Sequence, residues 1–199
     1  MNVDKIVKVI NEGKLVISPT DTVYGIMGDA LNDEVIKRVF FVKKRDVKKP
    51  LILLMNSIEM IYEYTCNINE LEQELINKYH PGLLTIILKK NDKISNLITG
   101  GLDTVGIRIP DNKDLLSIIG KLNRPVISTS ANISGSEVIT NIWMIENELK
   151  ENIDYIEDGG ELSDSYSTIV VVIDGKIKII RDGLLANQIR SDYSDICIN

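Results

Sequence analysis

Histidine, cysteine and long apolar runs are scarce in this 199-residue chain, and each scarcity excludes a class of protein. His80 is the only histidine, so neither a Ser-His-Asp hydrolase nor a histidine-rich zinc site has enough residues. The two cysteines, Cys66 and Cys197, lie far apart and lack metal-ligand spacing, which favours free thiols in a reducing compartment. No run approaches the roughly 18 apolar residues that cross a bilayer, and the first residues lack a signal-peptide core. We therefore expect a cytoplasmic protein.

Positive charge is also in short supply, since the net charge is −6. This value argues against a protein whose whole surface binds nucleic acid. The basic residues are nevertheless concentrated: seven of the 23 lysines and arginines lie between Lys37 and Lys49, where Asp46 is the one acid. A dense basic segment in an acidic protein indicates a local anionic ligand.

The glycine-rich motifs that bind phosphate, G-x-x-x-x-G-K-[ST] and G-x-G-x-x-G, are both missing. A phosphate site in this chain must therefore use side chains, and Lys43 and Arg45 are the candidates. On an extended segment these two residues would point to the same side and present an ammonium and a guanidinium together. A solvated basic helix end, which the helix dipole favours, is an equally good interpretation from charge alone.

Helical and strand periodicities alternate along the chain. Helices are expected at 2–12, from Asn32 through Phe40, at 69–79, 114–122 and 138–150, and strands at 15–18, 51–55, 83–89, 104–110 and after Pro125. Residues 167–174 and 176–181 flank Asp174-Gly175, which predicts a hairpin with a type I′ turn. A hairpin combined with crossovers indicates one α/β domain, residues 1–199, with a twisted mixed sheet of parallel and antiparallel strands and flanking helices.

Three of the expected strands run into small or charged polar residues. They are 16–25 (VISPTDTVYG), 104–110 (TVGIRIP) and 126–135 (VISTSANISG). Any one of them alone is best interpreted as a polar turn. Because ligands of α/β sheets gather where strand ends converge, the three together with the basic segment predict a binding site.

The chain resembles the YrdC-like family of threonylcarbamoyl-AMP synthases. The resemblance rests on PTDTVYGIMGDA, VKKRDVKKPLILL, PGLLTIIL, TVGIRIPDN, PVISTSANISG and STIVVVID, in this order, and covers about Ile10 to Arg181. It implies a twisted α/β sheet around a concave, positively lined cavity. It also implies a nucleotidyltransferase reaction in which L-threonine, bicarbonate or CO2, and ATP give threonylcarbamoyl-adenylate and pyrophosphate.

The resemblance further implies a role for individual residues. Those implied to face ATP or its phosphates are Lys43, Arg45, Lys49, Thr104, Ser130, Asn132, Val138 and Arg181, of which Lys43, Arg45, Ser130 and Asn132 are the expected catalytic set. Those implied to hold L-threonine are Thr22, Arg108, Ser128 and Ser167. Mg²⁺ is expected to arrive with ATP, with no metal site of the protein's own and no tightly bound cofactor.

Implied partners are a complex that transfers the threonylcarbamoyl group to tRNA and, weakly, tRNA itself; no membrane is implied. Three residues depart from the family pattern: Asp46 stands where proline is usual, Lys49 where asparagine is frequent, and Leu54 where some longer members have histidine. They put the details of the nucleotide and threonine contacts in question rather than the reaction. The end of the chain shortly after Arg181 favours the short, single-domain form as the better comparison.

Two other functions are compatible with the same residues. One is a carbamoyl transfer activity, because a related domain occurs in hydrogenase-maturation proteins, although those also carry zinc-finger cysteines that this chain lacks. The other is an RNA-binding or ribosome-assembly module without catalysis. With aromatic residues at 5% of an acidic chain, few side chains are available to stack on bases, which disfavours the RNA module.

Overall fold

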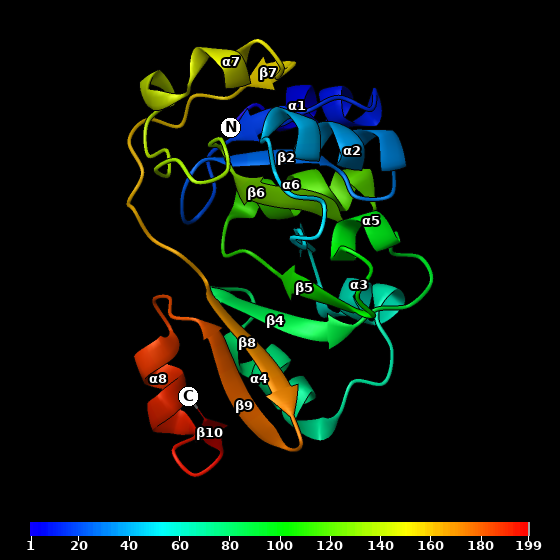
Figure 1. The fold of residues 1–199 in the computed structure, drawn as a ribbon, viewed down its shortest axis with the longest axis vertical. Coiled ribbons are helices and arrows are strands. Elements are labelled where there is room, and N and C mark those ends of the chain that lie inside the picture. The colour runs from blue at the N-terminus through cyan, green and yellow to red at the C-terminus, as the bar shows by residue number, and fades with distance from the viewer. Residues whose placement is uncertain (199) are drawn as a thin grey trace.

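One mixed β-sheet organises the protein, as a computed structural model that describes residues 1–198 shows (Figure 1). The strands follow the spatial order β10-β9-β8-β4-β5-β3-β6-β2-β1-β7. Neighbours are antiparallel in β1·β2, β2·β6, β3·β6, β4·β5 and β8·β9, and parallel in the other four pairs. The predicted mixed α/β sheet is therefore confirmed.

The bounds of the elements are as follows. The strands are β1 Val16–Ser18, β2 Gly25–Asp29, β3 Ile52–Leu54, β4 Leu84–Lys89, β5 Thr104–Arg108, β6 Val126–Ser130, β7 Tyr155–Ile156, β8 Thr168–Ile173, β9 Lys176–Arg181 and β10 Cys197–Ile198. The helices are α1 Val3–Asn11, α2 Asp33–Val42, α3 Ile58–Tyr64, α4 Glu70–Tyr79, α5 Asn96–Thr99, α6 Lys113–Leu122, α7 Asn147–Lys150 and α8 Ala186–Asp192, with a 3₁₀ turn at Ile142–Met144.

Asparagine side chains define where several helices begin. Asn2, Asn32 and Asn112 each accept a backbone N–H from the first turn of α1, α2 and α6, as a good N-cap does. Asn69 and Glu72 form a reciprocal capping box at the start of α4. These helices then turn their apolar stripes toward one continuous core that also contains the inner residues of the central strands.

The hairpin near the chain end is also confirmed. Asp174 and Gly175 have φ angles of +50° and +71°, as a type I′ turn requires, and β8 pairs with β9 on either side of them. Both cysteines are free thiols. No helix within residues 1–198 is long and apolar enough to span a membrane.

The predicted helix at 138–150 is wrong, because its backbone is used for pairing with other segments. The carbonyl of Ile139 accepts from the N–H of Tyr24, and that of Thr140 accepts from Leu162. Helical structure is limited there to the 3₁₀ turn and to the four residues of α7. The pattern also missed β2, β7, β10, α3, α5 and α8, which are short or contain glycine.

Strand register places the polar strand ends next to one another. In β6, Ser128 is the partner of Met27 in β2 and of Ile52 in β3, and Ser130 is the partner of Gly25. Leu54 in β3 is in turn the partner of Arg108 in β5. The expected convergence of residues 16–25, 104–110 and 126–135 therefore occurs around the centre of the sheet.

A long segment without helix or strand, residues 157–167, connects the two halves of the molecule. In Figure 1 it runs as an open trace along one side, from β7 near the top to β8 near the bottom. The hydroxyl of Tyr24 holds its start, donating to Gly160 O at 2.7 Å and accepting from Gly159 N at 2.8 Å. Its last residue, Ser167, lies beside the central strands, where its Oγ is 2.8 Å from Thr85 Oγ1 of β4.

Candidate active site

A cavity of about 180 Å³ lies at the converging strand ends. Its walls come from the segment after β1, from the loop before β3 with β3 itself, from β6, and from the end of the 157–167 segment. The lining residues are Thr20, Thr22–Gly25, Arg45, Pro50–Ile52, Leu54, Thr85, Arg108, Ser128–Ser130, Ser165–Ser167 and Arg181. Hydroxyl groups and three guanidinium groups thus face a space with apolar walls, which suits a small anionic or zwitterionic ligand.

Arg45 anchors the loop that leads into β3. Its Nε donates to Lys49 O at 3.2 Å and its Nη2 donates to Pro50 O at 2.8 Å. Burial lowers the pKa of this guanidinium from its ordinary value of 12.5, although arginine remains protonated in proteins. The Asp46 carboxylate accepts from Lys48 N at 2.9 Å, so the acid that departs from the family pattern shapes this loop.

Lys43 does not line the cavity but supports its wall from behind. Only 1% of the residue is exposed. Its Nζ donates to the carbonyl of Ser130, to Asn132 O at 2.7 Å and to Asn132 Oδ1 at 3.1 Å. Burial, followed by the charge of Arg45, lowers the pKa of the Lys43 amine to about 7.

The expectation that Lys43 and Arg45 share one side of an extended segment is wrong. Lys43 ends α2 with helical φ and ψ angles of −85° and −8°, and Lys44 then adopts a left-handed φ of +49°. This turn directs Lys43 inward and Arg45 toward the cavity. The alternative of a solvated basic helix end fits Lys44, which forms an exposed ion pair with Glu148.

The Ser130–Asn132 loop is a small network of hydrogen bonds. Ser130 Oγ donates to Asn132 Oδ1 at 2.6 Å, and Asn132 Nδ2 donates to Ser136 O at 2.6 Å. The N–H of Ala131 donates to Tyr24 O. Asn132 is therefore buried as a loop organiser, and of the two only Ser130 reaches the cavity.

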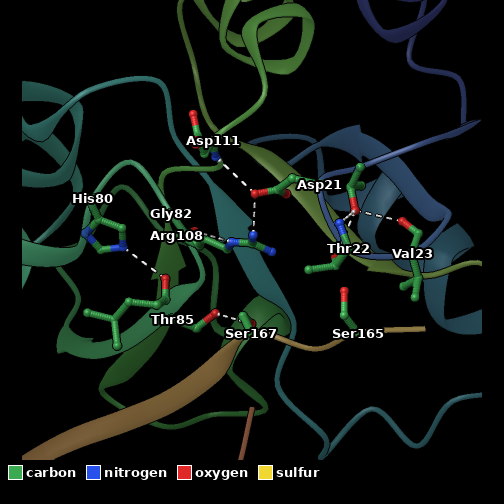
Figure 2. Close-up of polar contacts among 12 residues, drawn as sticks. Asp21, Thr22, Val23, His80, Gly82, Thr85, Arg108, Asp111, Ser165 and Ser167 are labelled. Atoms are coloured by element: carbon green, nitrogen blue, oxygen red, sulfur yellow. Dashed lines mark hydrogen bonds and ion pairs between the residues drawn. The ribbon is translucent and has the colours of Figure 1, made fainter. Parts of the chain in front are cut away.

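Arg108 is the most deeply buried charge of the cavity wall. It is 5% exposed, and Figure 2 shows its guanidinium between Gly82 and Asp21. Nε donates to Gly82 O at 2.8 Å, and Nη2 donates to Asp21 Oδ2 at 2.5 Å. Burial lowers the pKa of Arg108 from 12.5, whereas the Asp21 carboxylate opposes that shift.

Arg181 and its partners form another part of the cavity wall. Arg181 donates through Nη2 to Ser167 Oγ at 2.9 Å and through Nε and Nη2 to Ser167 O. The Ser167 hydroxyl also contacts Thr85 Oγ1 at 2.8 Å, as Figure 2 shows. The guanidinium carbon of Arg181 lies 5.5 Å from the centre of the Tyr166 ring, within cation–π range.

The threonine pair after β1 is fixed by its own backbone. Thr20 Oγ1 donates to Val23 O at 2.7 Å and accepts from Thr22 N at 3.1 Å. Its remaining contact, 2.9 Å to Thr22 Oγ1, is then donated by the Thr22 hydroxyl. The oxygen of Thr22 consequently keeps free lone pairs for a ligand's donor.

The cavity brings together most of the predicted site residues. Seven of them line it: Thr22, Arg45, Arg108, Ser128, Ser130, Ser167 and Arg181. The other five, Lys43, Lys49, Thr104, Asn132 and Val138, lie outside the lining; Lys49 is exposed, and Thr104 and Val138 are half-buried.

Sequence reasoning missed Thr85, Ser165 and Tyr166 in the lining, and Asp21 behind it. A lone threonine inside the apolar strand 84–89 was the available signal for Thr85, and the acid of PTDT was the signal for Asp21.

His80 is a buried, hydrogen-bonded residue outside the cavity lining. Its Nε2 donates to Leu84 O at 3.0 Å, and burial lowers its pKa to about 4, so the ring is neutral at pH 7. Within residues 1–198 no group of three histidine, cysteine or acidic side chains is placed to hold a metal ion.

The chain is similar to a known protein family and to several of its members. The model of the Sua5/YciO/YrdC family, which carries the description "Telomere recombination", matches residues 8–183. The chain is 40% identical over 184 residues to a protein of Methanocaldococcus jannaschii provisionally named threonylcarbamoyl-AMP synthase, covering 91% of this chain and 85% of that protein. It is 40% identical over 152 residues to the threonylcarbamoyl-AMP synthase of Pyrococcus abyssi, covering 76% of this chain but 45% of that protein.

The same architecture occurs in the crystal structure of P. abyssi Sua5 complexed with L-threonine. That structure superposes with a TM-score of 0.92 at 34% identity, covering 99% of this chain and 58% of the other. The chain thus spans about half the length of the P. abyssi protein and most of the M. jannaschii protein.

Proposed function

The chain belongs to the Sua5/YciO/YrdC family, and we propose that it is a threonylcarbamoyl-AMP synthase, which joins L-threonine, CO2 or bicarbonate, and ATP into threonylcarbamoyl-adenylate. The observation that carries this proposal is the composition of the cavity. All three charged residues in its lining are arginines, and they stand among hydroxyl groups at converging strand ends. Such a lining suits one ligand with a carboxylate and another with phosphates.

The proposal places the two substrates in two subsites of the cavity. Arg45 and Ser130 would face the ATP phosphates, supported by Lys43 and Asn132, with Arg181, Lys49, Thr104 and Val138 on the nucleotide side. Arg108, Thr22, Ser128 and Ser167 would hold L-threonine, with the guanidinium of Arg108 toward its carboxylate. Arginine presents a planar fork that matches both carboxylate and phosphate oxygens.

The proposed chemistry needs positioning and charge neutralisation rather than a catalytic histidine. The amine nitrogen of threonine attacks CO2 and loses its proton, which gives a carbamate. A carbamate oxygen then attacks the α-phosphorus of ATP, and the bond from that phosphorus to the pyrophosphate oxygen breaks. Guanidinium groups in a partly dry cavity stabilise the charge that develops on the phosphate oxygens. Mg²⁺, in this proposal, arrives with ATP and is held by its phosphates.

We further propose that residues 1–199 act as a single domain in the cytoplasm. Threonylcarbamoyl-adenylate is a mixed anhydride that water hydrolyses, so the reaction requires a partner that consumes it promptly. That partner would be the complex that transfers the threonylcarbamoyl group to tRNA, as the resemblance to the YrdC-like family implies.

Pyrophosphate release from ATP tests the proposal directly. L-threonine and bicarbonate are each omitted in turn for the wild type, for Arg45→Ala and for the control Arg38→Ala. Arg38 belongs to the same basic segment but pairs with Asp154 at 2.7 Å outside the cavity lining. We expect release that requires both substrates, falls at least about 100-fold in Arg45→Ala, and persists in Arg38→Ala.

Two results would contradict this function. Pyrophosphate release that does not depend on threonine would indicate a different ATP-dependent reaction. Tight RNA binding by a wild type that releases no pyrophosphate would support the RNA-binding module instead.

A further inference from the structure

The hydrogen bonds of Arg108 leave a defined part of its guanidinium free. Nε and Nη2 are the two nitrogens of the long edge of the group, and each already has a protein acceptor, Gly82 O and Asp21 Oδ2 (Figure 2). Within residues 1–198 Nη1 has no assigned acceptor. The end edge, formed by Nη1 and the second N–H of Nη2, therefore remains for a ligand that enters the cavity.

Asp21 is placed to hold this orientation rather than to touch a ligand. Its Oδ2 also accepts from Asp111 N at 3.0 Å, which ties it to the segment after β5. Its side chain is 12% exposed, and its Oδ1 is buried without a hydrogen-bond partner among the described residues. Asp21 is absent from the cavity lining, whereas both of its neighbours in PTDT, Thr20 and Thr22, belong to it.

The carboxylate of Asp21 also compensates the buried charge of Arg108 in the cavity wall. A guanidinium as buried as that of Arg108 is costly without a partner, and the charge of Arg181 makes its protonated form still less favourable. Asp21 supplies the compensating charge at one fixed corner of the group. A guanidinium without this carboxylate is free to turn toward other acceptors, which would misalign its end edge.

We propose that Asp21 is a positioning residue for substrate recognition: through its ion pair with Arg108 it presents the Nη1/Nη2 edge of the guanidinium to the α-carboxylate of the amino acid. This inference rests on the proposed function and adds to it a residue that acts on one substrate only. In that proposal the ATP phosphates lie beside Arg45, so substitution of Asp21 should not change the KM for ATP.

The test compares Asp21→Asn with a matched ion pair elsewhere in the sheet. Asp29, at the end of β2, bonds Arg124 Nε at 2.8 Å with a side chain that is 14% exposed, and lies outside the cavity lining. We expect Asp21→Asn to raise the KM for L-threonine about tenfold, because a charge-assisted bond becomes a neutral one, with little change in the KM for ATP. Asp29→Asn should leave both KM values unchanged. Asp21→Glu, which keeps the carboxylate but displaces it, should raise the KM for L-threonine less than Asp21→Asn does.

A ligand without the carboxylate separates positioning from general damage. L-threoninol, which carries an alcohol in place of the carboxylate, should inhibit the wild type and Asp21→Asn equally. If inhibition by L-threoninol weakens as much as threonine binding, Asp21 supports the cavity generally and the inference is wrong. A lowered KM for L-threonine would also overturn it, because a simple increase in positive charge would then outweigh orientation.

The outcomes keep the inference distinct from the proposed function. If wild-type pyrophosphate release ignores threonine, the proposed function fails and the inference fails with it. If the wild type requires threonine but Asp21→Asn matches Asp29→Asn in every KM, the function stands and the positioning role of Asp21 is refuted. If urea titrations show that Asp21→Asn does not fold, Asp21→Glu is compared with the wild type instead. Its longer side chain displaces the guanidinium of Arg108 and should raise the KM for L-threonine but not the KM for ATP; an unchanged KM for L-threonine would refute the positioning role.

Discussion

Lys43 offers a quantitative test of the electrostatics behind the cavity wall. The substitution Lys43→Met keeps the length of the side chain and removes its titrating group. In the folded protein the pKa of Lys43 is about 7, whereas in the unfolded chain it is near the ordinary 10.5. Between these values the unfolded chain binds a proton that the folded chain lacks, so the free energy of unfolding rises with pH by about 1.4 kcal/mol per pH unit.

The expected magnitude follows from these two pKa values. Below pH 7 both states are protonated, and the burial of the charge lowers the free energy of unfolding by a constant amount. From pH 6 to pH 9 this penalty shrinks by about 2.5 kcal/mol. Other groups titrate alike in both proteins, so the wild-type value minus the Lys43→Met value should increase by that amount. The hydrogen bonds that methionine cannot make change the offset between the two curves rather than their divergence.

Urea unfolding at several pH values measures this difference. Lys44→Met is the matched control, because Lys44 is adjacent, exposed and paired with Glu148 at the surface. Its difference from the wild type should stay within about 0.5 kcal/mol and should not vary with pH. Wild-type and Lys43→Met curves that run parallel from pH 6 to pH 9 would refute the depressed pKa of Lys43 and with it the claim that burial dominates at this site.

Two further predictions concern the segments that frame the cavity. Tyr24→Phe leaves Gly159 N and Gly160 O without their hydrogen-bond partner. We therefore expect the free energy of unfolding in urea to fall by about 1–3 kcal/mol and protease cleavage within residues 157–167 to become faster. An unchanged rate of cleavage would argue against this anchor. Gly100→Ala should lower the Tm more than Gly101→Ala does. Both glycines have positive φ, but only at Gly100 would a Cβ meet a backbone atom, Lys48 O at 2.7 Å. Equal Tm values would contradict the close packing of Gly100 against the loop that contains Lys48.

The regular parts of the fold could be predicted because local signals agreed with the tertiary structure. Apolar stripes located α1, α2, α4 and α6, with an asparagine cap as a further signal for the first two, and the Asp-Gly turn located the β8–β9 hairpin. The helix predicted at 138–150 failed for the opposite reason. Its carbonyls serve Tyr24 and Leu162, which are distant in sequence, and no local pattern reports such partners.

The candidate site was predictable as a set of residues but not as a geometry. The polar strand ends predicted a site within residues 16–25, 104–110 and 126–135, because small polar groups at such ends have few packing reasons. The family resemblance named Thr22, Arg108, Ser128 and Ser130 within those segments, and all four line the cavity. The direction of Lys43 was not predictable, since it depends on a left-handed φ at Lys44, a conformation that a lysine rarely adopts. The Asp21–Arg108 pair likewise depends on the order of strands across the centre of the sheet.

The two most buried cations near the cavity differ in how their charge is compensated, and this difference bears on which substrate lies where. Arg108 has a carboxylate beside it, so the Arg108–Asp21 pair is neutral overall. Lys43 is surrounded by carbonyl and amide oxygens, which solvate its ammonium without neutralising it, and Arg45 stands close enough to lower its pKa. A zwitterionic amino acid, neutral overall, fits the compensated end, because its carboxylate meets the guanidinium without an excess of positive charge. A polyphosphate fits the uncompensated end, where neither Arg45 nor Lys43, which is protonated below its pKa of about 7, pairs with a carboxylate of residues 1–198. Charge balance therefore agrees with the proposal that threonine lies at Arg108 and the ATP phosphates at Arg45.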